Sequence, residues 1–170
     1  TSFIDHDAVN LRMWLWGSYK HKLKGILIWA INYWNSNAAS PVGYLQNPWE
    51  NPMLYRSAYQ VPLGIQHHWG NGDGRFFYPL NRDPNNDSKT YVGYPVPSFR
   101  LELLRDGLED YEYFIMLENL VNGKKGKKNI RVEEARKLLE IPEYIYADEK
   151  TYSKNPIDIL LSNNHKAYSG

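Results

Sequence analysis

Residues 99–121, FRLELLRDGLEDYEYFIMLENLV, are the stretch of this sequence that says most about its fold. Apolar side chains recur along it at helical spacing and cover a wide face, which predicts one long helix packed against a sheet. Ser98 precedes the stretch as an N-cap candidate, and Gly123 follows it as a stop. Gly107 costs such a helix about 1 kcal/mol relative to alanine, which indicates a close backbone contact or a bend there.

Upstream of this helix, the continuous apolar run GILIWAI at residues 25–31 predicts a strand that is buried on both faces of a parallel sheet. The segment before it has helical spacing, and Asp5 or Asp7 would cap that helix. A second strand is expected at residues 75–78, after the Gly-Asp-Gly turn at residues 72–74. A helix followed directly by a buried strand is half of a repeat of a (β/α)8 barrel, so the fold class predicted is α/β.

Long polar loops separate these elements. Residues 35–71 hold four prolines and many Asn, Ser and Tyr, and loops of this length tend to be functional. A short strand is possible within them at residues 59–61. Residues 81–94 are rich in Asn, Asp and Pro, and they predict a surface loop.

The organisation predicted has two parts. Residues 1–123 form the barrel segment, and residues 124–170 form a basic connector and a helical tail that packs on it. Helices are expected in this tail at residues 132–139 and 157–161. The basic run at residues 124–128 has no interleaved aromatic residues, so a solvated connector is favoured over a phosphate or nucleic-acid site.

Composition narrows the function. The 170 residues include 6 Trp, 14 Tyr and 5 Phe, and this excess suits either a carbohydrate site or a core rich in large rings. There is no cysteine, so disulfides, thiolate metal sites and cysteine nucleophiles are excluded. A net charge of +1 gives no field that would attract nucleic acid, and no apolar stretch is long enough to span a membrane.

Ordered blocks of the sequence resemble the domain of unknown function 4091, which is the C-terminal part of the catalytic region of glycoside hydrolase family 123. The sharpest block is RDGLEDYE at residues 105–112. The other matching positions are Ile4, Asp5, Arg12, Trp16, 25–29, Asn32, Trp34, 72–74, Tyr78, Pro79 and 98–102. The resemblance implies the C-terminal portion of a (β/α)8 barrel, followed by a helical tail, in a periplasmic or extracellular protein.

In such barrels the site lies at the C-terminal ends of the strands. The candidate substrate-binding residues that follow are Trp29, Asn32, Trp34, Asp73, Tyr78, Arg100 and Glu102. Several of them have a structural alternative as well. Trp29 could be a core residue, Asn32 could end its strand, and Asp73 could serve only the turn between two glycines. The charges around Arg100 and Glu102 could be an ion-pair lattice on one helix.

The resemblance also implies a mechanism. An adjacent Asp-Glu pair acts without an enzyme nucleophile: Asp orients the acetamido group of a β-N-acetylgalactosaminide, and Glu protonates the leaving oxygen. Here Asp148-Glu149 follows no apolar strand and is interpreted as a surface pair, and Glu109-Asp110 is reversed within a helix. The catalytic pair is therefore expected upstream of Thr1, and this chain alone is not expected to be catalytic.

A second hypothesis stays open. The chain could be a non-catalytic carbohydrate-binding or structural module that keeps the fold: an Asp-Glu pair on the upstream strand would support the hydrolase, and its loss would support the module. Neither a cofactor nor a metal is expected, because His67-His68 and the group around His6 lack the spacing of a helical zinc site. The partners expected are a carbohydrate substrate and the upstream part of the same polypeptide, with no nucleic acid and no membrane insertion.

Overall fold

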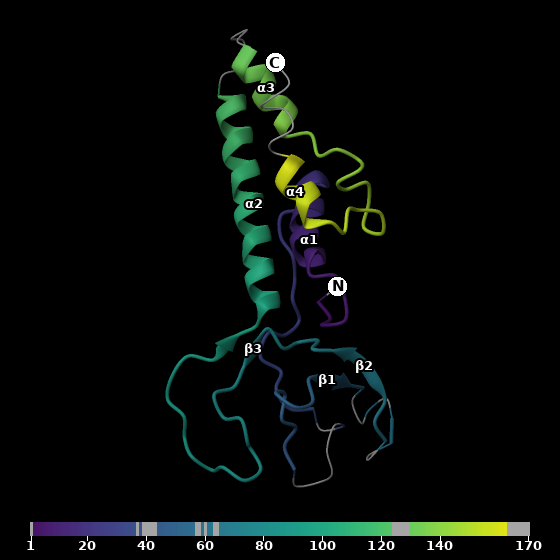
Figure 1. Cartoon of the computed structure of the whole chain (residues 1–170), viewed down its shortest axis with the longest axis vertical. Coiled ribbons are helices and arrows are strands. Elements are labelled where there is room, and N and C mark those ends of the chain that lie inside the picture. Colours follow the sequence, from purple (N-terminus) through teal and green to yellow (C-terminus); the bar gives the residue numbers. More distant parts are fainter. Residues whose placement is uncertain are drawn as a thin grey trace. The chain divides into compact units, whose positions relative to one another are not determined.

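The computed structural model describes residues 2–36, 38, 44–56, 59, 61–62, 65–123 and 130–162. Its elements are α1 (Val9–Lys20), β1 (Met53–Tyr55), β2 (His68–Asn71), β3 (Phe77–Tyr78), β4 (Val96–Pro97), α2 (Phe99–Asn122), α3 (Ile130–Leu138) and α4 (Pro156–Ser162) (Figure 1). Contacts divide the chain into two units. Residues 1–6 and 27–102 form a loop-rich unit, and residues 7–26 and 103–170 form a helical unit.

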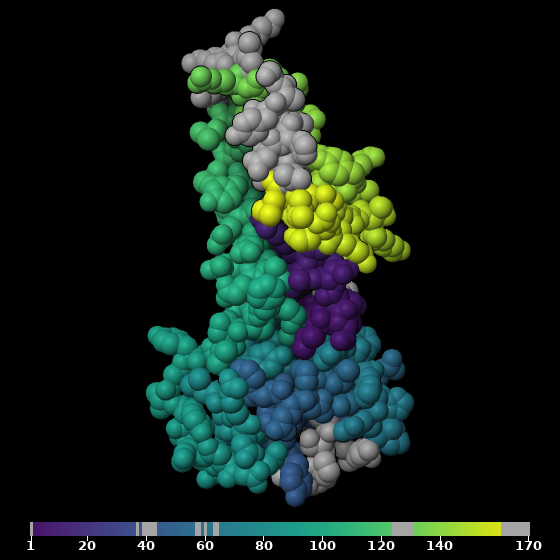
Figure 2. Space-filling model, viewed as in Figure 1, coloured from purple at the N-terminus to yellow at the C-terminus, as the bar shows by residue number. Residues whose placement is uncertain are grey.

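Aromatic packing holds the helical unit together. Trp16 and Tyr19 of α1 meet Phe114 of α2, the first edge-on at 5.1 Å and the second stacked at 4.6 Å between ring centroids. Ile159 of α4 and Ile145 join the same core and are 1% and 0% exposed. Burial of each large side chain contributes about 1.5–3 kcal/mol. Figure 2 shows the outer surfaces of α1 in purple, α4 in yellow and α2 in teal to green lying against one another.

Helix α1 begins later than predicted and without the expected cap. Its N-cap residue is Ala8, and no side chain caps the first turn. The prediction that Asp5 or Asp7 caps it was wrong, and the carboxylate of Asp7 instead pairs with Lys154 at 3.0 Å. The helix ends at Lys20, ahead of Gly25, and Lys22 follows in the left-handed region at φ 56°.

Helix α2 confirms the helix predicted at residues 99–121, but it packs on α1 through Phe114 and Gly107 rather than on a sheet as expected. The backbone N–H of Leu101 donates to Ser98 Oγ at 3.3 Å, so Ser98 caps the helix as its sequence position indicates. The last helical residue is Asn122, and Gly123 directly follows it. Helices α3 and α4 likewise confirm the elements expected at residues 132–139 and 157–161, within two residues at each end.

The loop-rich unit contains two small antiparallel sheets. In the first, β1 pairs with β2, with Met53 opposite Asn71 and Leu54 opposite Gly70 before an irregularity sets in. In the second, β3 pairs with β4. The strand expected at residues 75–78 is therefore present only as β3, Phe77–Tyr78. The residues described at 59 and 61 belong to no strand, and residue 60 lies outside the described ranges.

The predicted buried strand at residues 25–31 was wrong. The structure assigns no strand there, and Leu27, Trp29 and Ile31 are 82%, 54% and 41% exposed. A doubly buried strand needs partners for its backbone on both edges. Here the Ile31 carbonyl accepts the N–H groups of Phe76 and Phe77 at 2.8 and 3.0 Å. The described residues form a mixture of helices and small sheets without a closed barrel.

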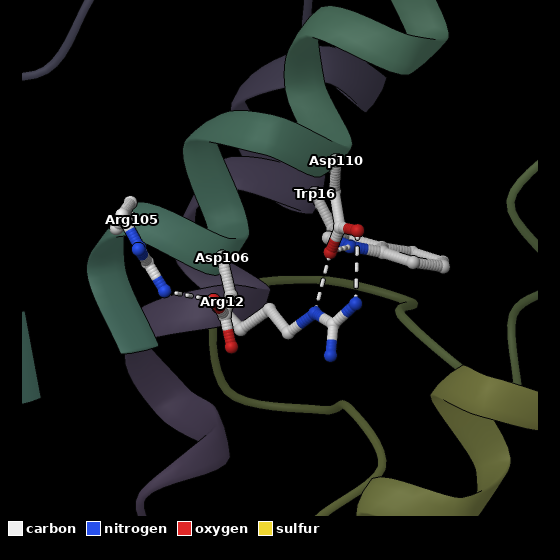
Figure 3. A network of polar contacts seen from close by, with 5 residues as sticks. All are labelled: Arg12, Trp16, Arg105, Asp106 and Asp110. Atoms are coloured by element: carbon white, nitrogen blue, oxygen red, sulfur yellow. Dashed lines mark hydrogen bonds and ion pairs between the residues drawn. The ribbon is translucent and has the colours of Figure 1, made fainter. Parts of the chain in front are cut away.

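The RDGLEDYE block at residues 105–112 lies in α2 and contacts α1 (Figure 3). Arg12 donates to both carboxylate oxygens of Asp110, from Nε at 2.5 Å and from Nη2 at 2.9 Å. Trp16 Nε1 donates to the same carboxylate at 2.7 Å. The hydrogen bond to Asp110 raises the pKa of Arg12. We call this set of three residues the clasp.

At Gly107 the two helices of the clasp approach each other closely. A Cβ at this position would stand 3.1 Å from Cα and 3.3 Å from the carbonyl oxygen of Arg12. Backbone atoms of a packed helix cannot move aside as a flexible side chain can. The close contact that the sequence indicated at Gly107 is confirmed, and the block serves helix packing.

Removing the carboxylate of the clasp will destabilise the protein. We expect Asp110→Asn to lower the free energy of unfolding by about 2 kcal/mol, because partly buried hydrogen bonds to a charged group are lost. Glu109→Gln is the control, since Glu109 is 59% exposed and lies 3.8 Å from Arg105. Its effect should stay below about 0.5 kcal/mol. Urea denaturation measures both, and equal effects would contradict a special role for Asp110.

Adding a methyl group at Gly107 should destabilise the protein despite the better helix propensity of alanine. The steric cost should exceed the propensity gain of about 1 kcal/mol and leave a net loss of about 1–2 kcal/mol for Gly107→Ala. Gly25→Ala is the matched control, because nothing lies within 4 Å of a Cβ there. A rise in melting temperature for Gly107→Ala would show that the helices can separate without cost.

Candidate functional site

The loop-rich unit contains an open pocket of about 450 Å³. It is lined by Trp29, Tyr33, Leu54, Tyr55, Arg56, Trp69 and Asp73. Four of these residues are aromatic. The two tryptophans are each 54% exposed, so their ring faces are accessible from solvent. Large exposed rings gathered in one hollow are typical of a surface that binds a ligand.

Strands β1 and β2 position one side of the pocket. Tyr55 ends β1, and it stands opposite His68 after the irregularity that follows Leu54. An extra residue in a strand turns the following side chain to a new direction, and such bulges are frequent next to binding sites. The ring of Tyr55 packs edge-on against His68 at 5.3 Å. Trp69 follows on β2 and contributes its ring to the lining.

Trp29 and Tyr33 form the other side. Their rings lie 5.2 Å apart and are tilted by 54°. Gly74 makes room for them, because a Cβ on that residue would lie 2.8 Å from Trp29 Cζ2 and 3.2 Å from Tyr33 Cβ. Gly74 also has φ +70°, a conformation that favours glycine. The turn therefore fixes where this pair of rings can lie.

Asp73 connects the two sides of the pocket. It is 8% exposed, and its Oδ1 accepts hydrogen bonds from Trp29 Nε1 at 3.4 Å and Ser2 Oγ at 3.2 Å. Its Oδ2 accepts from Trp69 Nε1 at 3.1 Å. One carboxylate thus holds both indole rings by their Nε1 edges. Asp73 belongs to the turn and to the pocket at once, so its two predicted roles do not exclude one another.

Arg75 supports the turn from behind. It is fully buried, and Nη1 donates to the carbonyls of Pro52 and Asp73 at 3.2 and 3.3 Å. Nη2 donates to Gln46 Oε1 at 2.8 Å. Burial lowers the pKa of Arg75. Its positive charge is balanced by carbonyl dipoles, and the sequence analysis did not single out this residue.

Arg100, a predicted substrate-binding residue, has a similar supporting position. Its Nη1 donates to the carbonyls of Ser2 and Gly72, the latter at 2.8 Å, and Nη2 donates to the carbonyl of Arg75 at 2.5 Å. It is 9% exposed, and burial lowers its pKa. Arg100 therefore binds the backbone of the turn that carries Asp73, and it lies outside the pocket lining.

Trp34 and Tyr78 also lie outside the lining. Trp34 Nε1 donates to the carbonyl of Phe77 at 2.8 Å, which attaches the ring to β3. Tyr78 packs against Trp49 with 4.8 Å between ring centroids. Both aromatic side chains are partly buried by these contacts. A direct role for either in substrate binding stays a prediction.

Asn32 and Glu102 complete the predicted set. Asn32 forms an isolated antiparallel bridge with Arg75, and Glu102 lies in the first turn of α2. Neither lines the pocket. Of the predicted residues, Trp29 and Asp73 are the two that the structure brings together there.

Five other lining residues were not predicted from the sequence, and one of them, Tyr33, directly follows the candidate Asn32. Leu54, Tyr55, Arg56 and Trp69 come from the long segment at residues 35–71, which was expected to be functional as a whole. No periodicity marks individual positions in that segment. Within the described residues, no group of three His, Asp or Glu is placed to hold a metal ion. No helix there combines the length and apolar character needed to cross a bilayer.

Loss of the Asp73 carboxylate should loosen the pocket. We expect Asp73→Ala to weaken the near-ultraviolet circular dichroism of tryptophan and to lower the free energy of unfolding by about 1–3 kcal/mol, because two indole N–H groups lose their acceptor. Glu50→Ala, at an exposed position of the same unit, should change neither. An unchanged tryptophan signal in Asp73→Ala would mean that packing alone holds the rings.

The sequence of this chain matches a known protein family. The family described as glycoside hydrolase 123, catalytic domain, matches residues 1–117. The matched region includes every residue of the pocket lining and the block at residues 105–112. A search of curated proteins finds none that matches the chain. Because the match spans more than half of the sequence, the chain belongs to the glycoside hydrolase 123 catalytic-domain family.

Proposed function

We propose that the aromatic pocket binds a sugar ring of a glycan, and that this chain supplies substrate contacts to a glycoside hydrolase. The observation that carries the proposal is the pair of exposed indoles, Trp29 and Trp69, held edge-on by Asp73. The C–H faces of a pyranose ring stack on such aromatic faces, while nearby polar groups bind its hydroxyls.

The size and polarity of the pocket support a saccharide. Its volume of about 450 Å³ lies within the range of about 300–1,000 Å³ found for small-molecule sites. The lining is predominantly aromatic, with Asp73 and Arg56 as its charged groups. Two other polar candidates, Asn32 and Arg100, would act on the substrate indirectly, through the turn that carries Asp73 and the residue Arg75 beside it.

Three carboxylates that the pocket or the sequence motifs bring forward, Asp73, Asp148 and Asp110, are poor candidates for the chemical step. Asp73 already accepts three hydrogen bonds. Asp148 Oδ1 accepts the backbone N–H groups of Lys150 and Thr151 at 2.8 Å in an exposed turn, and the Lys150 N–H is the first cause of the lowered pKa of Asp148. The Asp110 carboxylate already accepts hydrogen bonds from Arg12 and Trp16 within the clasp.

For the chemical step we therefore propose an Asp-Glu pair carried by polypeptide that precedes Thr1. In this mechanism the acetamido oxygen of a β-N-acetylgalactosaminide attacks the anomeric carbon, with Asp orienting the acetamido group. Glu donates a proton to the leaving oxygen, and it then deprotonates the incoming water. The part of this chain is to hold the sugar ring in register with those groups.

A non-catalytic carbohydrate-binding module is the second candidate. The same observation favours it, since the one carboxylate in the lining is engaged by Trp29, Trp69 and Ser2. This candidate keeps the sugar-binding pocket and lacks only the hydrolytic step.

Hydrolysis and binding together test the proposal. In the protein at its natural length, we expect release of the aryl group from an aryl N-acetyl-β-galactosaminide. Trp69→Ala should lower kcat/KM about tenfold or more through loss of stacking. Trp14→Ala is the matched control, because Trp14 is a 36% exposed tryptophan of α1 outside the pocket. Its kcat/KM should stay unchanged.

The outcomes separate the candidates. Saccharide binding that depends on Trp69 but is not accompanied by hydrolysis would favour the binding module. If no saccharide binds, or if Trp69→Ala and Trp14→Ala have equal effects, the pocket is not a sugar site. Trp69→Phe adds a further distinction, because it keeps a stacking ring but removes the N–H that donates to Asp73.

A further inference from the structure

Arg56 is the one formal cation in the pocket lining. Its side chain is exposed, and its guanidinium lies over the ring of Trp69 at 5.7 Å from the centroid. Its backbone N–H donates to the carbonyl of His67 at 2.9 Å, which attaches the residue to the segment that leads into β2. Among the residues that the structure describes, no Asp or Glu forms an ion pair with the Arg56 side chain.

The two charged groups of the pocket, Asp73 and Arg56, differ in how accessible they are to a ligand. Asp73 is 8% exposed and accepts hydrogen bonds from three donors, so little of its carboxylate faces a ligand. The Arg56 guanidinium faces solvent beside a ring on which a sugar would stack. A planar guanidinium presents parallel N–H donors that match the oxygens of a carboxylate or a sulfate. An uncharged ligand would leave the positive charge of this guanidinium without an opposite charge in the complex.

We propose that Arg56 selects glycans that carry an acidic group, a carboxylate or a sulfate ester, on or next to the ring stacked against Trp69. The inference rests on the proposed sugar-binding function of the pocket. Asp73 would repel an anion, so the acidic group lies on the Arg56 side of the pocket and the uncharged hydroxyls lie toward Asp73. The opposite charges of Arg56 and Asp73 thereby determine how the sugar ring is oriented in the pocket, as well as which class of glycan binds.

A structural role for Arg56 makes a different prediction. If its guanidinium only covers the Trp69 ring, its removal would affect neutral and acidic saccharides alike. Arg82 offers a matched comparison within the same unit, because its guanidinium lies over the ring of Trp49 at 4.1 Å, outside the pocket lining. Both guanidinium groups lie over a tryptophan ring, that of Arg56 at the greater distance, and only Arg56 belongs to the pocket lining.

The test compares three saccharides of equal length: a neutral one, one with a uronic acid and one with a sulfate ester. Binding to the full-length protein is measured by calorimetry at low salt. We expect the wild type to bind one or both acidic saccharides about tenfold more tightly than the neutral one. The preference should weaken as salt is raised, because Arg56 is exposed.

Arg56→Gln should remove this preference, and Arg82→Gln should retain it. Arg56→Lys, which keeps the charge but loses the planar fork, should retain part of it. The two acidic saccharides then show whether a carboxylate or a sulfate is preferred. If neutral and acidic saccharides bind equally to the wild type, or if the preference survives Arg56→Gln, the inference fails while the sugar-binding function stands. If no saccharide binds, both fail.

Discussion

Two buried guanidinium groups hold the backbone on which the loop-rich unit depends. Arg75 and Arg100 donate to the carbonyls of Pro52, Ser2 and residues 72, 73 and 75. This unit has only short strands, so its sheets satisfy few backbone groups. Side-chain donors take over part of that task, as buried carbonyls require. The turn at residues 72–74 is thereby fixed, and with it the carboxylate between the two pocket walls.

The sequence predicted the helices better than the strands, for a physical reason. Residues 99–121 carry their helical signal within themselves, as spacing, cap and stop. Residues 25–31 carry only an apolar, β-prone composition, and a strand exists only where another segment pairs with it. Within the described residues the partner of this segment is limited to the turn around Arg75 and Phe76. Local composition could not reveal that difference.

The candidate site was predictable in part. Trp29 and Asp73 were placed near a mouth because family resemblance supplied a barrel, and the structure brings them together through one hydrogen bond. Tyr55, Arg56 and Trp69 come from a long irregular segment, where side-chain direction depends on a strand irregularity that no pattern announces. The most recognisable block, residues 105–112, turned out to pack two helices through Gly107 and Asp110. A recognisable sequence motif can therefore serve the packing of the fold rather than the catalytic reaction.

The carboxylate of Asp73 accepts hydrogen bonds from two indole groups. Trp29 Nε1 and Trp69 Nε1 approach different oxygens of the same group, and Ser2 occupies a further position on it. Both indole positions therefore depend on one carboxylate, so a ligand that displaces one ring also disturbs the hydrogen bond that holds the other.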